Sequence, residues 1–510
     1  MVSVFKMKKI LNFNKIKSIK NFFAGNKKKI VLCHGVFDLI HIGHIKHFES
    51  AKKMGDILIV SLTPDKYVNK GPERPIFNEK LRAEFLNNVT IIDYVIINNS
   101  PTSINVIKTI KPDVYCKGSD YKDHTKDITG QIKNEIKEVE RFGGKVKYTS
   151  DITNSSSKLI NAHYLDFSNS KKKAINEIKK TNLKNEKIFK SFENLKVLVI
   201  GETIIDQYFF CETLGKSGKD PILQMQEFNT ETYIGGSAAI AGNLSKFCNS
   251  VSFISMIGEN KKYLNLIKNK LAKNIKSTFF YKKNSPTIVK KKYIDLVSNH
   301  KVFGSYIIND SSFDKLNEKR LGNLLNKNVN KHDLVIVSDY GHGFISKKNA
   351  RIISKKSKFL ALNAQINAAN RGYHTMEKYL NSDCVIINET ELRHELRNKN
   401  DNLRELMKKL SQKNKIKDLV VTQGSVGATL YNKKLNKFFD MDAFASKVVD
   451  KIGSGDTMLS ILALCLKAKL NKHLALLIGS LAASQSVSSI GNKFLIDKIN
   501  LKKAIEHTLK

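Results

Sequence analysis

The chain of 510 residues lacks several features that would point to common classes of protein. It has no tryptophan, and its six cysteines never form a CxxC pair. Residues 1–29 hold scattered Phe and Ile between lysines but no continuous apolar run, which argues against a secretory signal or a membrane span. No GxxxxGK[ST] loop of the Walker type occurs, and we find no internal repeat. The length is too great for one ordinary core, so two or three domains are expected.

The few cysteines argue for a reducing compartment. Most of them stand inside apolar runs, where a buried free thiol is the ordinary state. Their separation in the sequence argues against a zinc site, so we expect a cytoplasmic protein with no metal site. The six positions are Cys33, Cys116, Cys211, Cys248, Cys384 and Cys465.

Acidic residues are scarce relative to basic ones. The 87 Lys and Arg against 47 Asp and Glu give a formal net charge of +40. Such a balance is typical of nucleic-acid or anionic-membrane binding. Here the lysines are spread along the whole chain, and there is no RNA-binding aromatic motif or Arg cluster. We expect no specific nucleic-acid partner and no membrane partner, only weak and salt-sensitive binding of polyanions. An RNA-associated basic protein stays as a rival interpretation.

The most informative stretch is His-Gly-Val-Phe-Asp-Leu-Ile-His-Ile-Gly-His at residues 34–44. It follows an apolar strand and leads into a helical pattern that starts at His44. His41 and His44 are three residues apart, so both rings can point the same way at a helix start. Helix-start amides favour an anion, and two imidazoles beside them can hold a triphosphate. Gly35 would let a nucleotide approach the backbone, and Phe37 would anchor the turn in the core.

The region from Lys29 to about Ile160 alternates strands with helices. Alternation of this kind predicts a parallel sheet with helices on both faces. A second alternating region opens at Lys196 and runs to the C-terminus, after a polar, Lys-rich stretch that we interpret as a helical linker. Before the first domain, the apolar positions Ile10, Phe13, Ile16 and Ile19 predict an amphipathic helix. The expected strands of the first domain are 30–33, 57–62, 92–97, 113–116 and 145–148.

The motif at 34–44 resembles the HxGH signature of the nucleotidyltransferase superfamily. Two later motifs follow in the family's order, Lys117-Gly-Ser-Asp-Tyr121 and Asn154-Ser-Ser-Ser-Lys158. Over residues 28–165 the chain resembles the adenylyltransferase half of the bifunctional heptose-phosphate enzymes, with three serines where the family usually has a threonine. The resemblance implies in-line attack by a substrate phosphate on the α-phosphorus of a nucleotide. His41 and His44 are then catalytic, and the nucleotide-binding residues are Gly35, Phe37, Lys70, Arg82, Lys117, Ser156 and Ser157.

The second region carries Asp450-Lys-Ile-Gly-Ser-Gly-Asp456 just before a long apolar helix. Glycines at a helix start expose amides to a transferring phosphoryl group, and Asp456 could take a proton from a sugar hydroxyl. This stretch resembles the C-terminal signature of the ribokinase-like (PfkB) sugar kinases, with Lys451 for the customary Thr and Ser454 for the customary Ala.

Other marks of that family follow in the expected order. The resemblance implies sugar contacts at Asp206, Gly235, Gly236, Asn243 and Asp339. It implies binding of ATP, and an anion hole, at Asn388, Glu391, Gly424, Gly453, Ser454 and Gly455.

Two departures bear on the sugar. Heptose kinases carry Asp-Pro-Lys on the strand that here reads Leu362-Asn-Ala-Gln365, and His342 stands where a lysine is common. These changes leave phosphoryl transfer in place but put the heptose substrate, and the activity of the kinase domain, in question. A sugar-sensing protein whose kinase fold binds without turnover is a second rival.

We therefore predict an α/β protein in which a Rossmann-like nucleotidyltransferase domain precedes a ribokinase-like domain, the reverse of the usual heptose enzyme. The predicted function is bifunctional: an ATP-dependent sugar kinase, plus transfer of NMP, with AMP favoured, to a sugar phosphate. The alternative is a CTP-dependent cytidylyltransferase acting on a polyol or other sugar phosphate, with a divergent kinase domain. ATP or CTP with Mg²⁺ is expected, and homo-oligomerisation stays open. The predicted segments are 1–28 (helical extension), 29–164, 165–193 (linker) and 194–510.

Overall fold

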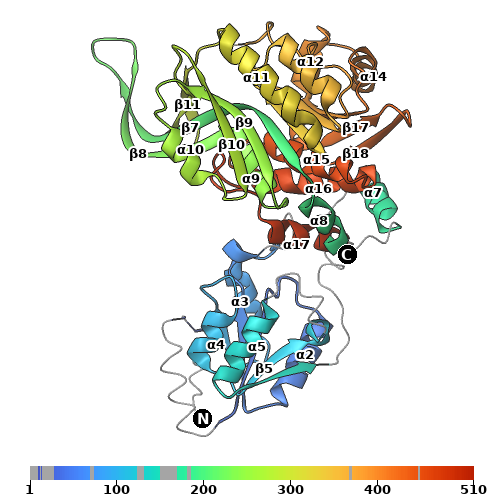
Figure 1. Ribbon diagram of the computed structural model, residues 1–510. Helices are drawn as coiled ribbons and strands as arrows, with labels where there is room; N and C mark the ends of the chain where they lie inside the picture. Colours follow the sequence, from blue (N-terminus) through green and yellow to red (C-terminus); the bar gives the residue numbers. More distant parts are fainter. Residues whose placement is uncertain are drawn as a thin grey trace. The chain divides into compact units, whose positions relative to one another are not determined.

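The computed structural model divides the chain into two compact units (Figure 1). Met1–Asp166 with Lys502–Lys510 form the first unit, and Phe167–Leu501 form the second. The structure describes residues 10, 11, 13, 28–68, 70, 74–122, 131–149, 169–180, 185–366, 370–445 and 448–509.

The first unit is built on a six-stranded parallel sheet in the order β1-β4-β3-β2-β5-β6. Runs of Ile, Val and Leu form its central strands because both faces are buried, as parallel sheets require. The strands are β1 (Ile10–Leu11), β2 (Ile30–Gly35), β3 (Ile57–Leu62), β4 (Tyr94–Ile97), β5 (Val114–Gly118) and β6 (Lys145–Thr149).

Helices cover both faces of this sheet. Val31 and Cys33 of β2 lie on the face of the sheet that α2 and α3 cover. Ile30 and Leu32 lie on the opposite face, which α4 and α5 cover. This alternation follows from the two-residue period of a strand. The helices are α2 (Ile42–Lys52), α3 (Glu79–Asn87), α4 (Ile104–Ile110) and α5 (Ile132–Arg141).

The beginning of the chain differs from the predicted amphipathic helix. Ile10 and Leu11 form β1, which pairs in parallel with Val95 and Ile96 of β4. The edge of β4 offers unpaired backbone groups, and pairing satisfies them, so a strand replaces a helix at these two residues. Ile16 and Ile19 lie outside the described residues.

The second unit has a larger mixed sheet. Its main path runs β10-β9-β7-β13-β14-β15-β16-β17-β18, parallel up to β16 and antiparallel beyond it. The strands on this path are β7 (Val197–Lys216), β9 (Val251–Gly258), β10 (Ile275–Lys282), β13 (Leu334–Asp339), β14 (Leu360–Ala364), β15 (Cys384–Asn388), β16 (Asp418–Thr422), β17 (Ala428–Asn432) and β18 (Lys437–Met441).

The 20-residue strand β7 belongs to two layers. Its first residues lie between β9 and β13, and its later residues pair with β8 (Leu223–Gly236) and β11 (Ile288–Asp295), which pairs in turn with β12 (Lys301–Ile307). At the crossing, a Cβ on Gly201 would stand 2.2 Å from the Ser338 carbonyl oxygen, so glycine is required there. The far ends of β7 and β8 extend away as a two-stranded ribbon (Figure 1).

Helices cover both faces of the main sheet (Figure 1). One layer contains α11 (Lys315–Asn328), α12 (Lys347–Lys356), α13 (Glu389–Glu395) and α14 (Leu403–Lys413). The other contains α9 (Ser237–Ser245), α15 (Ser454–Lys467) and α16 (Lys472–Ser486). Helix α10 (Leu264–Lys270) also belongs to the second unit, whereas α17 (Lys498–Leu509) begins in the second unit and continues into the first.

The predicted linker holds two helices, α7 (Asn169–Lys179) and α8 (Asn185–Glu193). Helix α7 packs against α16 and β18 and buries Ile175 and Ile178, and α8 buries Phe189 and Phe192. This burial of apolar area makes both helices part of the second unit. Among the described residues, no helix is long and apolar enough to cross a membrane.

Candidate active sites

In the first unit, the motif lies where the order of the sheet reverses. The chain passes from the central strand β2 to β3 and β4 on one side, and to β5 and β6 on the other. Ligands of such sheets bind at the carboxyl ends of the strands beside this switch point. His34 and Gly35 end β2, and Lys117 and Gly118 end β5, so both motifs meet at this edge.

The two motif histidines form the N-terminus of α2. His41 is the N-cap, and its Nδ1 atom accepts a hydrogen bond of 3.1 Å from the Gly43 amide. His44 Nδ1 lies 3.4 Å from the His41 amide, which donates to it, and the two ring centroids are 4.1 Å apart. The histidines therefore replace the Ser and Glu of an ordinary capping box.

Both imidazoles are neutral near pH 7. Burial lowers the pKa of His41. Burial and the nearby charges of His41 and Lys70 lower the pKa of His44 to about 3. Because each Nδ1 accepts a bond from a backbone amide, the proton of each neutral ring is on Nε2. His41 Nε2 is buried without a hydrogen-bond partner, so it is a donor ready for a ligand oxygen.

Gly35 and Phe37 pack against each other. Phe37 is buried with a φ of 50°, and its ring contacts those of His44 and Phe48. A Cβ on Gly35 would stand 2.9 Å from the Phe37 ring. The glycine is thus needed to admit this ring, whose edge supports the His44 imidazole.

Arg82 is a predicted phosphate-binding residue whose guanidinium contacts other groups of the protein. Its guanidinium is buried, donates to the carbonyls of Phe77, Val36 and Thr63, and pairs with Asp65 at 2.6 Å. These bonds tie the turn after β2 to the end of β3. With its nitrogens directed at these partners, Arg82 holds the motif in place, and its contact with a nucleotide stays a prediction.

Lys117 lies in a buried anionic environment at the end of β5. Its Nζ atom is 3.3 Å from Glu135 Oε2 and lies over the rings of Tyr115 and Tyr121. Burial lowers the pKa of Lys117, but Tyr115 and Glu135 outweigh burial and hold that pKa well above its usual value. Lys117 is therefore a cation at the switch point. Ser156 and Ser157 lie outside the described residues.

The second unit repeats this geometry. Its switch point lies between β7 and β13, and α15 begins nearby, at Gly453, whose φ is 82°. Asp456 stands in the first turn of α15 and accepts a hydrogen bond of 2.7 Å from the Tyr340 hydroxyl. Burial raises the pKa of Asp456 to about 6, and Tyr340 and Lys290 oppose that rise. The carboxylate is therefore ionised, and basic, at neutral pH.

Two ionisable residues of this site, Glu202 and Lys290, belong to none of the sequence motifs. Glu202, just after the crossing of β7, accepts hydrogen bonds from the amides of Tyr340 and His342, and burial and Asp339 raise its pKa to about 7. Lys290 on β11 is influenced electrostatically by Asp206, Asp456 and Glu202, while burial lowers its pKa. A lysine in a strand is ordinary, so only the fold identifies Lys290 as part of the site.

Asp206 is one of the predicted sugar contacts, and it lies on β7. Its carboxylate is buried and pairs with Lys292 Nζ at 2.5 Å. A Cβ on Gly235 would lie 2.3 Å from Asp206 Oδ2, so this glycine makes room for the acid. Gly236 has a φ of 62°, and a Cβ there would lie 2.6 Å from the Glu202 carbonyl oxygen. The two glycines thus serve the close approach of β8 to β7.

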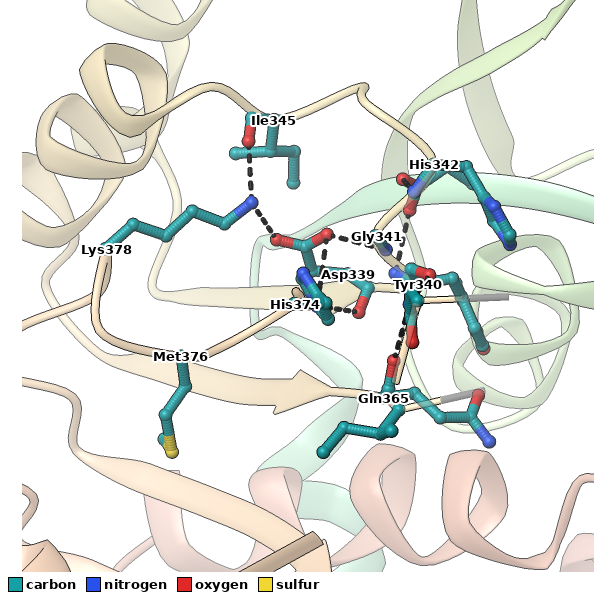
Figure 2. A network of polar contacts seen from close by, with 12 residues as sticks. Asp339, Tyr340, Gly341, His342, Ile345, Gln365, His374, Met376 and Lys378 are labelled. Carbon is teal, nitrogen blue, oxygen red and sulfur yellow. Dashed lines mark hydrogen bonds and ion pairs between the residues drawn. The ribbon is translucent and has the colours of Figure 1, made fainter. Parts of the chain in front are cut away.

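Asp339 and Asn243 are used inside the protein. The Asp339 carboxylate pairs with Lys378 at 2.6 Å and accepts a bond from the Gly341 amide (Figure 2). It also accepts a bond from the Tyr379 hydroxyl. Despite burial, Lys378 and His374 hold the pKa of Asp339 below its usual value. With these partners, Asp339 organises the turn after β13, and its predicted sugar contact stays a prediction.

Asn243 likewise donates to Thr457 Oγ1 at 3.3 Å and accepts from the Ile496 amide at 3.1 Å. Both ends of its buried amide are thereby engaged, and it joins α9 to α15. The predicted sugar contact of Asn243 stays a prediction.

The predicted nucleotide segment contains a capping box. Asn388 caps α13 by accepting from the Glu391 amide, and Glu391 accepts from the Asn388 amide at 2.9 Å. Burial raises the pKa of Glu391 to about 7, and Asp456 adds to that rise. Glu391 is thus a buried acid, and it lies close enough to Asp456 for the charge of that carboxylate to raise the pKa of Glu391.

The glycines of this region differ in what surrounds them. A Cβ on Gly424 or Gly455 would meet no atom within 4 Å, so a ligand could approach the backbone there. A Cβ on Gly453 would lie 2.3 Å from Asn492 Oδ1. The Ser454 hydroxyl donates to the Lys451 carbonyl.

His342 and the departure at 362–365 lie beside this network. His342 Nδ1 pairs with Asp310 at 2.6 Å, and its Nε2 atom is buried without a hydrogen-bond partner. The Gln365 amide donates to the Asp339 carbonyl, so this strand contributes backbone there (Figure 2). Lys378, from the segment that follows, supplies a cation that the strand itself lacks.

The two folds and their switch-point residues define a transferase with a nucleotidyltransferase-like domain and a carbohydrate kinase domain. The chain belongs to the pfkB family of carbohydrate kinases, whose sequence profile matches residues 194–499. The cytidylyltransferase-like family matches residues 32–163, which include the HxGH motif.

Curated relatives match part of the chain. The chain is 41% identical over 139 residues to the bifunctional protein HldE of Aliarcobacter butzleri, covering 27% of this chain and 29% of that protein. It is 35% identical over 162 residues to HldE of Geobacter metallireducens, covering 30% and 32%. These matches span about a third of each relative. A phosphofructokinase-2 mutant from Escherichia coli shares the fold of the second domain, with a TM-score of 0.51 and 13% identity, over 62% of this chain and all of that one.

Proposed function

We propose that this chain is a bifunctional enzyme of sugar-nucleotide synthesis. The first domain couples a sugar phosphate to the NMP part of a nucleotide, with ATP favoured, and releases pyrophosphate. The second phosphorylates a sugar from ATP. One observation carries the proposal: each domain places a helix N-terminus and its motif residues at the switch point of its sheet, where anionic ligands bind.

In the first reaction, a phosphate oxygen of the sugar phosphate attacks the α-phosphorus, and the bond to the pyrophosphate oxygen breaks. No protein nucleophile is required. His41 and His44 donate from Nε2 to the triphosphate, and the positive end of the α2 dipole favours the same charge. Lys117 adds a buried cation. Because the donors are held before the ligand arrives, they need little reorganisation in the transition state.

In the second reaction, Asp456 takes the proton from a sugar hydroxyl. The oxygen of that hydroxyl attacks the γ-phosphorus of ATP, and ADP leaves. The pKa of about 6 suits a general base at neutral pH. Tyr340 fixes the carboxylate, and the amides at the start of α15 face the transferred phosphoryl group. Because Gly455 has no side chain, the phosphoryl group can approach the backbone at that helix start.

The residues of the second site also fit Mg²⁺. The pKa of Glu391 is raised to about 7 by burial and by Asp456, which indicates an environment short of positive charge. Glu391 is thus the residue that would help to hold the ion, through its carboxylate. When bound, Mg²⁺ neutralises charge on the phosphates of ATP.

The basic residues near Asp206 support a sugar that already carries a phosphate. Lys290 is placed among Asp206, Asp456 and Glu202, and Lys292 pairs with Asp206. Lys290 is only partly buried, so its ammonium group can pair with a phosphate on the substrate as well as with these carboxylates.

The alternative is a CTP-dependent cytidylyltransferase whose kinase domain has diverged. His342 and Asn363, which stand where heptose kinases have Lys and Asp, favour this alternative. Against it, Asp456, Tyr340 and Gly455 form a complete base and helix start. The alternative therefore differs mainly in the nucleotide of the first site and in the sugar of the second.

The test measures two products from one purified protein. Pyrophosphate release is followed with ATP or CTP against a panel of sugar 1-phosphates that includes heptose 1-phosphates, and ADP formation is followed with free sugars and sugar phosphates. We expect both products, with phosphorylated sugars preferred as kinase substrates. Pyrophosphate with CTP alone and no ADP with any sugar would favour the alternative. Ligand-induced stabilisation without turnover would support a sugar sensor.

A further inference from the structure

The first domain brings together three metal-ligating side chains that are far apart in the sequence. Cys33 of β2 and Cys116 of β5 are direct partners in neighbouring parallel strands, and His47 lies on α2. One ligand atom from each of the three residues lies within 4.8 Å of the other two. We expected no metal site because the cysteines are far apart in the sequence. The pairing of β2 with β5 brings Cys33 and Cys116 together in space.

This cluster differs from an ordinary buried thiol. All six cysteines are free and buried, yet Cys33, Cys116 and His47 form the only such grouping of metal-ligating side chains in the part of the chain that the structure describes. His47 Nδ1 lies 2.8 Å from Thr149 Oγ1, which fixes the orientation of the ring. An imidazole held from one nitrogen by a neighbouring oxygen is the usual arrangement of a metal ligand.

We propose that Cys33, Cys116 and His47 bind a Zn²⁺ ion in the first domain. Two thiolates and one imidazole are ligands that Zn²⁺ favours, and these three residues supply three of the four positions of a tetrahedral site. On binding, the two thiols release two protons, and two Zn–S bonds and one Zn–N bond form. No redox step is involved, because Zn²⁺ keeps its charge.

The site joins the three elements that carry the first active site. Strand β2 continues from Cys33 into His34 and Gly35, and β5 continues from Cys116 into Lys117. Helix α2, which carries His47, begins at the motif histidines. A bound ion would therefore cross-link β2, β5 and α2 and raise the stability of the domain. The metal site itself does not depend on the proposed function.

The first experiment uses the reduced, full-length protein after removal of metal. Co²⁺ serves as the spectroscopic probe, because thiolate ligands give it intense charge-transfer absorption and a tetrahedral site gives visible d–d bands. Zn²⁺ should displace Co²⁺ in a competition titration, with one ion bound per chain. Absence of thiolate–cobalt absorption in the wild-type protein would overturn the proposal, and this result needs no variant that has to fold.

Variants assign the ligands. Cys116→Ser and His47→Gln should each weaken Zn²⁺ binding by at least about tenfold, whereas Cys248→Ser, another buried free cysteine, should leave it unchanged. His47 is only half-buried, so His47→Gln is the variant most compatible with folding. Zn²⁺ should raise the melting temperature of the wild-type protein but not of His47→Gln. Equal Zn²⁺ affinity in the wild type, Cys116→Ser and His47→Gln would mean that the ion binds elsewhere.

Discussion

The Tyr340 hydroxyl donates a hydrogen bond of 2.7 Å to Asp456, although the two residues are 116 positions apart. Tyr340 follows β13 and Asp456 lies in the first turn of α15, so the bond links the switch point of the sheet to the start of this helix. Burial raises the pKa of the same carboxylate to about 6, which suits the general base that we propose.

Asp456→Asn should lower ADP formation by about 10²-fold or more, because an amide cannot accept the proton of the sugar hydroxyl. Pyrophosphate release by the first domain should not change. Asp401→Asn removes a carboxylate that pairs with Lys409 on the surface, and it should change neither product. Steady-state assays of the two products make this comparison, and undiminished ADP formation by Asp456→Asn would place the base elsewhere.

Acid should inactivate the kinase as Asp456 takes up a proton, so kcat/KM should fall below about pH 6. The Tyr340 hydroxyl lowers the pKa of Asp456, and Tyr340→Phe should therefore move this limb to higher pH. Because folding raises the pKa, the contribution of Asp456 to stability is present below its unfolded value and is lost as the pH rises through about 6. Asp456→Asn should then melt at a higher temperature than the wild type at pH 8. If the pH at which kcat/KM falls were the same in Tyr340→Phe and the wild type, the hydrogen bond from Tyr340 to Asp456 would be contradicted.

His44→Ala should remove pyrophosphate release by at least about 10²-fold and leave ADP formation intact, because it deletes a donor to the triphosphate. The control is Lys46→Ala on the same helix, since Lys46 pairs with Glu49 at the surface. Surviving nucleotidyl transfer in His44→Ala would mean that the first site lies elsewhere.

Arg82→Met should destabilise the first domain by about 3 kcal/mol, because the buried Thr63 carbonyl and two part-buried carbonyls lose their donor. Folded Arg82→Met protein should keep a KM for the nucleotide close to that of the wild type. Urea unfolding and nucleotide titration separate the two effects. A large rise in KM at unchanged stability would return Arg82 to the phosphate-binding role.

Lys378→Met should destabilise the second domain by about 3–5 kcal/mol, because it leaves the buried Asp339 carboxylate without its cation. Adding Asp339→Asn should recover part of that loss, since the remaining amide is neutral. The four proteins of this double-mutant cycle can be compared by urea unfolding. Additive effects would show that the pair does not act as a unit.

Periodicity and motif order predict the architecture well. The expected strand at 57–62 coincides with β3, and the stretch before Asp456 does begin a long apolar helix. These features depend on local sequence, because apolar runs form buried parallel strands and glycines open helix starts.

The roles of individual polar residues were harder to predict, because they depend on contacts between distant segments. Arg82 and Asp339 have suitable chemistry and positions, yet both are buried and engaged by partners inside the protein. Lys290 looks like any lysine of a strand, and only the fold brings it near Asp456. Cys33 and Cys116 are 83 positions apart in the chain but are register partners in the sheet.

The central claim is that one chain holds two independent sites, and the paired variants test it most directly. Pyrophosphate release with ATP and a sugar 1-phosphate, and ADP formation with a sugar phosphate, should be measured for His44→Ala and Asp456→Asn beside the wild type. The account predicts that each variant loses one product and keeps the other. Loss of both products in either folded variant, or of neither, would contradict it.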